Sequence, residues 1–242
     1  MKTRAFTLVE MLVVMAILGI LSALLLPALA RGKIKAREMY CRNNLSQIGK
    51  ALSMYLGDFH KYPGSRGAPT GIPANSPTQY VNWQYMWDQR LLPYAGGKTA
   101  VFDCPSEHPS SHGGITNYSY GYNAYGTALL LPQLSLGLGR DLPPDPDPAD
   151  PRTVVGESQV QAPADMLAVG DLNDFPQGFM ATFIPQVTAP WLGGPSARHR
   201  GGANFVFCDG HLEFAERLAW SAATPAARRR WNNDHEPHPE TW

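Results

Sequence analysis

The chain opens with a short basic leader followed by a long run of apolar residues. Residues 6–30 read FTLVEMLVVMAILGILSALLLPALA, and the stretch from Met11 to Ala30 carries no charge. A helix rises about 1.5 Å per residue, so about 20 apolar residues cross the hydrocarbon core of a bilayer. No second run of comparable hydrophobic length follows in the sequence. The pattern therefore predicts a leader at residues 1–5 and one transmembrane helix over residues 6–30.

Glu10 places a carboxylate near the start of this apolar run. A charged residue at the centre of a membrane helix costs roughly 2.5 to 3.5 kcal/mol, whereas the Leu, Ile and Val residues between Leu12 and Leu29 together return on the order of 3 to 7 kcal/mol. The span therefore tolerates the charge, and an ionisable residue in a membrane segment indicates a function. A cut after Ala5 would create an amine at Phe6, four residues from Glu10 on one helix face. We expect Glu10 to pair with that amine, in its own chain or in a neighbouring subunit.

Apolar positions then continue at helical spacing beyond the membrane segment. They recur at intervals of four, three, four and three residues: Cys41, Leu45, Ile48, Leu52 and Tyr55. Such spacing forms a single apolar stripe on a helix. We therefore predict an amphipathic continuation over residues 31–56, which ends at the turn-forming residues from Gly57 to Gly64.

The remaining sequence predicts an exported globular β-rich domain over residues 57–223, followed by a flexible tail at residues 224–242. Runs with strand-like composition are Val101–Asp103, Tyr118–Asn123, Met166–Gly170, Phe179–Ile184 and Ala203–Phe207. The tail contains three consecutive arginines and then mainly His, Pro and Glu, which build no core. The predicted fold class is α+β, with a long N-terminal helix packed on a small antiparallel sheet.

A β-hairpin is the most sharply defined local structure in this domain. Asp209-Gly210 is a favoured two-residue turn. If it closes the hairpin, the facing pairs are Cys208 with His211, Phe207 with Leu212, Val206 with Glu213, and Phe205 with Phe214. This register places the four apolar residues Phe205, Phe207, Leu212 and Phe214 on one face, which we expect to pack on the helix stripe or on another strand.

The N-terminal string RAFTLVEMLVV resembles the class III signal of type IV pilins and of the pseudopilins of type II secretion systems. The resemblance implies that a prepilin peptidase removes the leader after Ala5 and methylates Phe6. It also implies that Glu10 promotes filament assembly and that Pro27 corresponds to the proline that kinks the family's membrane helix. Ala5 stands where the family usually has glycine.

Motifs farther along extend this resemblance to a bacterial group of pilin-like proteins named for a His, nine residues and Asp-Gly. His199 and Asp209-Gly210 have that spacing. The sequence also carries strings similar to the group's internal motifs: Cys41-Arg42-Asn43-Asn44-Leu45 with Gln47-Ile48-Gly49, Phe102-Asp103-Cys104-Pro105-Ser106, and Tyr118-Ser119-Tyr120-Gly121-Tyr122-Asn123. Most of the chain is therefore covered by the resemblance.

Two roles are open for His199. It can order the loop before the hairpin by bonding Asp209 or a backbone carbonyl, or it can bind a metal together with Asp209, His211 and Asp171. Calcium would instead favour the oxygen ligands of Asp171, Asn173, Asp174 and Asp209, and some pseudopilins carry a calcium site in this region. No cofactor is required by the sequence, and no nucleophile is placed near His199, so we predict no catalytic residues.

The three cysteines allow a disulfide in an oxidising compartment. A bond between Cys41 and Cys104 would join the helix to the domain and contribute roughly 4 kcal/mol through loop closure, leaving Cys208 unpaired. Three reduced cysteines are the alternative.

These observations predict a non-enzymatic structural subunit of a type IV pilus or a type II secretion-like pseudopilus. Its partners would be prepilin peptidase, copies of itself or other pseudopilins in a helical filament, and an inner-membrane assembly platform. We expect a single-pass protein of the bacterial inner membrane with its C-terminal domain in the periplasm, and an extracytoplasmic filament after assembly. The net charge of zero argues against a polyanion-binding surface, so no nucleic acid is implied.

Three alternatives stay open. A secretory signal could be cut after Ala30 to release a protein starting at Arg31, or the apolar run could be an uncleaved anchor. The protein could also be a membrane-anchored or secreted periplasmic binding module that uses the aromatic residues of Tyr80–Trp87 and Tyr118–Tyr125.

Overall fold

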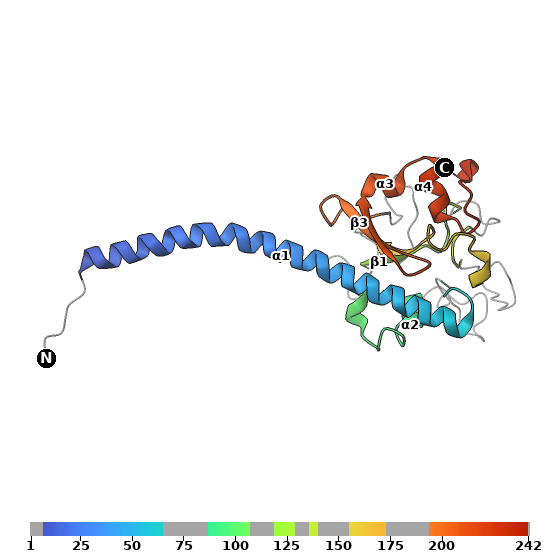
Figure 1. Cartoon of the computed structure of the whole chain (residues 1–242), viewed down its shortest axis with the longest axis horizontal. Coiled ribbons are helices and arrows are strands. Elements are labelled where there is room, and N and C mark those ends of the chain that lie inside the picture. The colour runs from blue at the N-terminus through green and yellow to red at the C-terminus, as the bar shows by residue number, and fades with distance from the viewer. Residues whose placement is uncertain are drawn as a thin grey trace, which may run out of the picture. The chain divides into compact units, whose positions relative to one another are not determined.

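The computed structural model describes residues 7–64, 87–106, 119–128, 136–139, 155–172 and 194–241. It has an α+β fold with a long N-terminal helix and a four-stranded antiparallel sheet (Figure 1). The elements are, in chain order, α1 (Leu8–Phe59), α2 (Trp87–Leu91), η2 (Thr99–Phe102), β1 (Tyr120–Tyr122), η3 (Glu157–Gln159), β2 (Leu167–Asp171), β3 (Gly202–Phe207), β4 (Leu212–Glu216), α3 (Arg217–Ser221), α4 (Pro225–Arg228), η4 (Arg229–Trp231) and η5 (Pro239–Thr241). Internal contacts divide the chain into two units, Met1–Met39 and Tyr40–Trp242.

The first unit consists, in its described part, of the N-terminal portion of α1. Every side chain from Thr7 to Arg37 is exposed. Among the described residues, α1 is the one helix long and apolar enough to span a membrane. Pro27 lies inside it, and the predicted kink stays a prediction. An apolar surface of this length needs lipid or other apolar helices around it.

The second unit begins with the buried face of α1. All five residues of the predicted stripe are buried, from Cys41 at 0% exposed to Tyr55 at 7%. The stripe is therefore confirmed. The helix runs past Gly57 and ends at Phe59, because His60 adopts a left-handed conformation (φ 53°) while its N–H donates to the Leu56 carbonyl at 2.8 Å.

Three of the predicted strands are confirmed as β1, β2 and β3, which lie in the sheet order β1-β2-β3-β4. The prediction of a strand at Val101–Asp103 is wrong. That segment forms the 3₁₀ turn η2, in which the Val101 and Asp103 N–H groups donate to the Lys98 and Ala100 carbonyls. Local bonds therefore satisfy backbone groups that a strand would have offered to a neighbour. The candidate strand Phe179–Ile184 lies outside the described residues.

The β3–β4 hairpin exists, but its predicted register is wrong by one residue. Val206 pairs with Leu212 and Phe205 with Glu213, and the Phe207 N–H donates to the His211 carbonyl at 2.9 Å. The turn has three residues, 208–210. The Gly210 N–H donates to the Phe207 carbonyl, and Gly210 takes a left-handed conformation (φ 89°), as in a type I turn extended by a glycine bulge.

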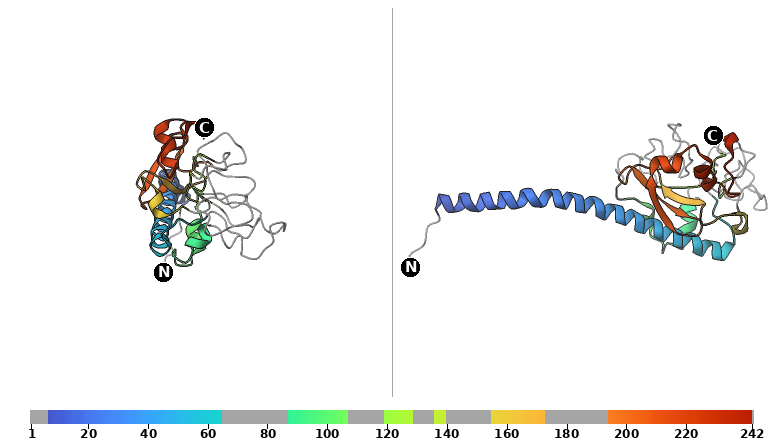
Figure 2. Two further views of the ribbon diagram at one scale, coloured as in Figure 1. Left: turned by 90° about the vertical axis from the view of Figure 1, so that its right-hand side faces the viewer. Right: turned by 45° about the horizontal axis from the view of Figure 1, so that its top comes forward.

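This shift places Leu212 and Phe214 on the face of Val206, opposite Phe205 and Phe207, so the predicted single face of four apolar residues is wrong. Phe205 packs against Trp220 and Trp231, with ring centroids 4.8 and 6.0 Å apart. Val206 points to the opposite face, where a Cβ added to Gly49 of α1 would lie 3.0 Å from it. The sheet is thus a middle layer between α1 and the C-terminal helices (Figure 2). All six residues of β3 are buried as a result.

The C-terminal segment is part of this fold, which corrects the expectation of a flexible tail from residue 224. Thr224 caps α4 by accepting from the Ala227 N–H, and Pro225 follows in the first turn. Trp231 is fully buried: its indole N–H donates to the Trp220 carbonyl, and its own carbonyl accepts from Asn123. Composition alone did not predict a folded segment here, because the buried Trp231 lies among charged residues.

Gly170→Ala is expected to destabilise the domain by about 1–3 kcal/mol. Gly170 pairs with Phe205, and a Cβ at this position would overlap the Phe205 ring. Urea denaturation followed by tryptophan fluorescence measures the change. Gly57→Ala is the control, because a Cβ there meets nothing within 4 Å on a helix, where alanine is favoured by up to about 1 kcal/mol. Equal stability of the two variants would contradict the placement of Phe205.

The C-terminal turn around His238 is expected to loosen as the pH rises. Burial lowers the pKa of His238, but hydrogen bonds to Asp234 (2.7 Å) and Glu240 (2.8 Å) outweigh this and hold the pKa above its usual value. The stabilisation is therefore complete below pH ~6.5 and is lost as the pH rises through the folded-state pKa. Hydrogen-exchange protection of residues 234–241 should fall over that range, and His238→Gln should remove the pH dependence. Constant protection in the unmodified chain would refute the link between protonation of His238 and the stability of this turn.

Candidate functional site

Thr7 and Glu10 form a reciprocal cap at the start of α1. The Thr7 N–H and hydroxyl both donate to Glu10 Oε2 at 2.8 Å, while the Glu10 N–H donates to Thr7 Oγ1 at 3.3 Å. This arrangement is a capping box. The carboxylate in the first turn also interacts favourably with the positive end of the helix dipole. The sequence interpretation missed this role of Thr7, although Thr-x-x-Glu before an apolar run is its known signal. Ala5 and Phe6 lie outside the described residues, so the contact of Glu10 with a Phe6 amine stays a prediction.

Separate sequence motifs meet where α1 packs on the sheet. A Cβ added to Gly49 would lie 3.1 Å from the Gly210 carbonyl oxygen, so the hairpin turn packs closely on the helix at this glycine. The Asn44 amide donates to the Asp103 carbonyl at 2.8 Å, and the Tyr120 hydroxyl donates to the Cys41 carbonyl at 3.4 Å. The motifs are therefore joined mainly through side chains that fix α1 on its domain.

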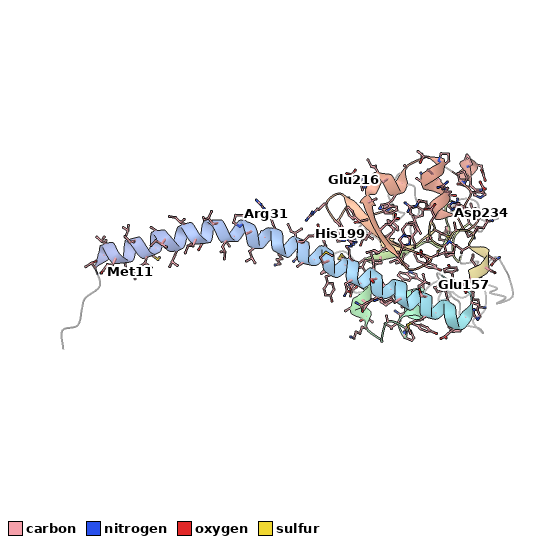
Figure 3. The ribbon with its side chains drawn as sticks, in the orientation of Figure 1. Met11, Arg31, Glu157, His199, Glu216 and Asp234 are labelled. Atoms are coloured by element: carbon pink, nitrogen blue, oxygen red, sulfur yellow. A yellow bond between two sulfur atoms is a disulfide. The ribbon has the colours of Figure 1, made fainter. Side chains whose placement is uncertain are left out.

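A buried polar cluster lies in the same region. Cys41 of α1 and Cys104 form a disulfide, and among the described cysteines Cys208 is unpaired. His199, labelled in Figure 3, lies with Nε2 3.7 Å from Cys104 Sγ and 3.4 Å from Asp171 Oδ2. All these side chains are at most 4% exposed. The disulfide thus borders a buried histidine–aspartate pair.

Asn204 completes this cluster from β3. Its backbone N–H and side-chain amide donate to Asp171 Oδ2 at 2.7 and 2.8 Å. Three buried atoms of the cluster have no hydrogen-bond partner among the described residues: Asp171 Oδ1, His199 Nδ1 and Asn204 Oδ1. An unsatisfied buried polar atom costs about 1–3 kcal/mol, so their concentration at one place marks a functional candidate.

The structure separates His199 from the other predicted ligands Asp209 and His211. His199 lies before the base of the hairpin, where it bridges to Gly202, whereas Asp209 lies in the turn at the far end. There Asp209 Oδ1 is 2.6 Å from His211 Nδ1. The proposed His199–Asp209 contact is therefore wrong, and Asp171 takes its place. Asn173 and Asp174, the other calcium candidates, lie outside the described residues.

Cys208 lies apart from the disulfide and contacts Tyr62. Burial raises the pKa of the Cys208 thiol, and burial together with the nearby Cys208 raises the pKa of Tyr62. Cys208 is therefore a neutral, hydrogen-bonded core residue rather than a nucleophile.

The aromatic residues proposed for a binding surface are largely internal. Within the described part of those two stretches, Trp87, Tyr120 and Tyr122 are at most 1% exposed, and Trp87 stacks on Tyr122 with a centroid distance of 5.6 Å. Burial of these three rings takes them out of the surface on which the binding-module alternative depended. Residues 80–86 lie outside the described part.

Comparison with known proteins identifies the family. The chain is 30% identical over 122 residues to type II secretion system core protein G of Pectobacterium carotovorum subsp. carotovorum, a match covering 76% of that protein and 50% of this chain. It is 31% identical over 136 residues to the Klebsiella pneumoniae protein of the same name, covering 97% of it and 50% of this chain. The chain belongs to the type II secretion system core protein G family. As a member of this pseudopilin family, it is a pilin-like structural subunit.

Two family models match consecutive stretches in the N-terminal part of this core protein G homologue. Residues 1–26 match the prokaryotic N-terminal methylation motif, and residues 31–101 match a family described as a protein of unknown function (DUF1559). The Escherichia coli (strain K12) core protein G is 40% identical over 62 residues, a match covering 43% of that protein and 26% of this chain. No solved structure matches the chain. The cap formed by Thr7 and Glu10 at the start of α1 therefore lies within the methylation motif.

Proposed function

We propose that prepilin peptidase cleaves this chain after Ala5 and methylates Phe6. The mature protein is then anchored in the bacterial inner membrane by the apolar part of α1, with its domain in the periplasm. From there it joins copies of itself or other pseudopilins on an inner-membrane platform to form a type II secretion-like pseudopilus. It acts as a structural subunit and not as an enzyme.

One observation carries this proposal: the methylation motif at residues 1–26 coincides with an exposed apolar helix headed by a carboxylate. In lipid, hydrocarbon surrounds the apolar side chains. In a filament, neighbouring helices would replace the lipid at little cost, because lipid tails and leucine side chains are similarly apolar. The Glu10 charge cannot be transferred so easily, since a buried charge without a partner is strongly unfavourable. Glu10 therefore selects an arrangement in which a cationic group, the Phe6 amine, lies beside it.

The cysteine pair supports export of the domain. Disulfides persist in oxidising compartments such as the periplasm and are rare in the cytosol. The Cys41–Cys104 bond fixes the domain to the helix that anchors it, because Cys41 lies on α1. When assembly draws the helix out of the membrane, the disulfide would keep the folded domain attached to that helix.

Mass spectrometry of the mature N-terminus tests the proposal. The chain is expressed with and without a prepilin peptidase, and we expect an N-methylated Phe6 only with the enzyme. An N-terminus at Arg31, or an intact Met1 in the presence of the peptidase, would contradict it. Ala5→Gly is the matched control: it restores the residue usual for the family and should be processed at least as completely as the unmodified chain.

A further inference from the structure

The surroundings of the Cys41–Cys104 disulfide contain the donor set of a metal site. Ligand atoms of Cys41, Cys104 and His199 all lie within 4.8 Å of one another, and all three residues are buried. Two sulfurs and one imidazole nitrogen suit zinc and other thiophilic ions. The sequence candidates His199, Asp209 and Asp171 contained no cysteine, so the structure defines a different set.

The distances around His199 fit a tetrahedral ion. With zinc–nitrogen and zinc–oxygen bonds of about 2.0–2.1 Å and a zinc–sulfur bond of about 2.3 Å, neighbouring ligands of a tetrahedron lie about 3.5 Å (nitrogen to sulfur) and about 3.3 Å (nitrogen to oxygen) apart. The observed separations from His199 Nε2 are 3.7 Å to Cys104 Sγ and 3.4 Å to Asp171 Oδ2. Neither is a short hydrogen bond, so His199 and Asp171 lie close without making a strong direct bond.

Asp171 is the neighbouring carboxylate: its Oδ2 is 3.4 Å from His199 Nε2, but it lies outside the group of ligand atoms within 4.8 Å of one another, so it becomes the fourth ligand only if it moves toward the sulfurs when the disulfide opens. Its Oδ2 is held by the two donors of Asn204, and ligating carboxylates are commonly oriented in this way by hydrogen bonds. Among the described residues, Asp171 Oδ1 and His199 Nδ1 have no hydrogen-bond partner. A bound cation would offset the cost of burying the carboxylate.

We propose that, when its cysteines are reduced, the chain binds one zinc ion through Cys41, Cys104 and His199, with Asp171 at the fourth position. The disulfide and the zinc site exclude each other, because both use the same two sulfurs. A dithiol opens the disulfide by transferring two electrons and two protons and is itself oxidised to a disulfide. Zinc then displaces the two thiol protons as the thiolates bind. Either form joins α1 to the domain, so the helix stays attached whether the cysteines are oxidised or reduced.

Cobalt titration tests the site in the full-length chain in detergent micelles. The chain is reduced with a phosphine, which is oxidised to its phosphine oxide, and Co²⁺ is added. We expect one Co²⁺ per chain, thiolate-to-cobalt absorption in the near ultraviolet, tetrahedral bands in the visible, and their loss on addition of Zn²⁺. The oxidised chain should show none of these bands. Their absence from the reduced chain would overturn the proposal.

Variants separate this site from nonspecific binding by thiols. Cys208→Ser should keep all the bands, because Cys208 lies outside the cluster. The double variant Cys41→Ser/Cys104→Ser should lose them, and Asp171→Asn should weaken Co²⁺ binding by at least about 10-fold, the smallest loss typical even of a residue that only orients a ligand. Bands that survive in the double variant but disappear in Cys208→Ser would refute the assignment.

Folding is followed in the same samples. Zinc should raise the melting temperature of the reduced chain but not that of the double variant. If reduction alone unfolds the domain, recovery of its circular dichroism on addition of zinc supports the site, since metal binding then supplies folding free energy. No recovery would count against it.

Discussion

Replacing Cys41 and Cys104 together with serine is expected to lower the free energy of unfolding of the domain by about 4 kcal/mol. The two residues are 63 positions apart in the sequence, and their bond removes the entropy of a loop of that length from the unfolded chain. Both side chains are buried, so the native state gains no compensating solvation when the bond is absent. For a domain of this size, the melting temperature should fall by about 8–16 °C. Thermal denaturation in detergent with a metal chelator, followed by tryptophan fluorescence, measures the change.

Cys208→Ser is the matched control for this double variant. It removes a buried thiol but keeps a hydroxyl that can bond Tyr62, so we expect a loss below about 1.5 kcal/mol. A double variant as stable as the unmodified chain would show that the disulfide does not constrain the domain. A Cys208→Ser variant that loses more stability than the double variant would assign the effect to thiol removal in general.

The long helix was predictable because its signals are local. The apolar run needs only length and composition, and the stripe from Cys41 to Tyr55 follows the helical period. The end of the helix was less well predicted. His60, which adopts a positive φ, ends α1 instead of Gly57, a helical glycine with open space around it. Packing of the preceding turn, with Leu56 buried, carries the helix beyond the glycine.

The hairpin register was not predictable from alternation alone. Asp-Gly suits a two-residue turn, but it also suits a three-residue turn with glycine in the left-handed position. The choice shifts every pair by one residue. Alternation normally decides such cases because one face is apolar, yet β3 is buried on both faces, between α1 and the C-terminal helices. Trp220 and Trp231, which cover the second face, belong to a segment whose composition resembles a tail.

The candidate site likewise contains one contact that the sequence could predict and one that it could not. The pairing of Thr7 with Glu10 spans three residues and could be read directly as a capping pattern. The pairing of His199 with Asp171 depends on where β2 and β3 lie in the sheet, because Asn204 holds Asp171 in place across the two strands. The sequence gives no local signal for such a contact, and the Asp-Gly motif drew attention to Asp209 instead.

Glu10→Ala is expected to abolish incorporation of the chain into filaments while leaving it as a membrane-inserted monomer. The substitution removes both roles of the carboxylate: the cap at Thr7 and the proposed charge pair with a Phe6 amine. Insertion should persist, since removing a charge from an apolar helix makes insertion more favourable. Filament yield after shearing, compared with the amount of subunit in the membrane fraction, measures the effect. A normal filament yield would refute an assembly role for Glu10.

Glu10→Gln and Thr7→Ala separate the two roles. Glutamine can replace glutamate in a capping box, so Glu10→Gln keeps the bond to the Thr7 N–H but removes the charge. Thr7→Ala keeps the charge and removes the hydroxyl that accepts from the Glu10 N–H. If the charge pair selects the subunit arrangement, Glu10→Gln should fail to assemble as completely as Glu10→Ala, and Thr7→Ala should retain most of the filament yield. The opposite ranking would mean that Glu10 acts by starting the helix and that assembly depends on the order of its first turn.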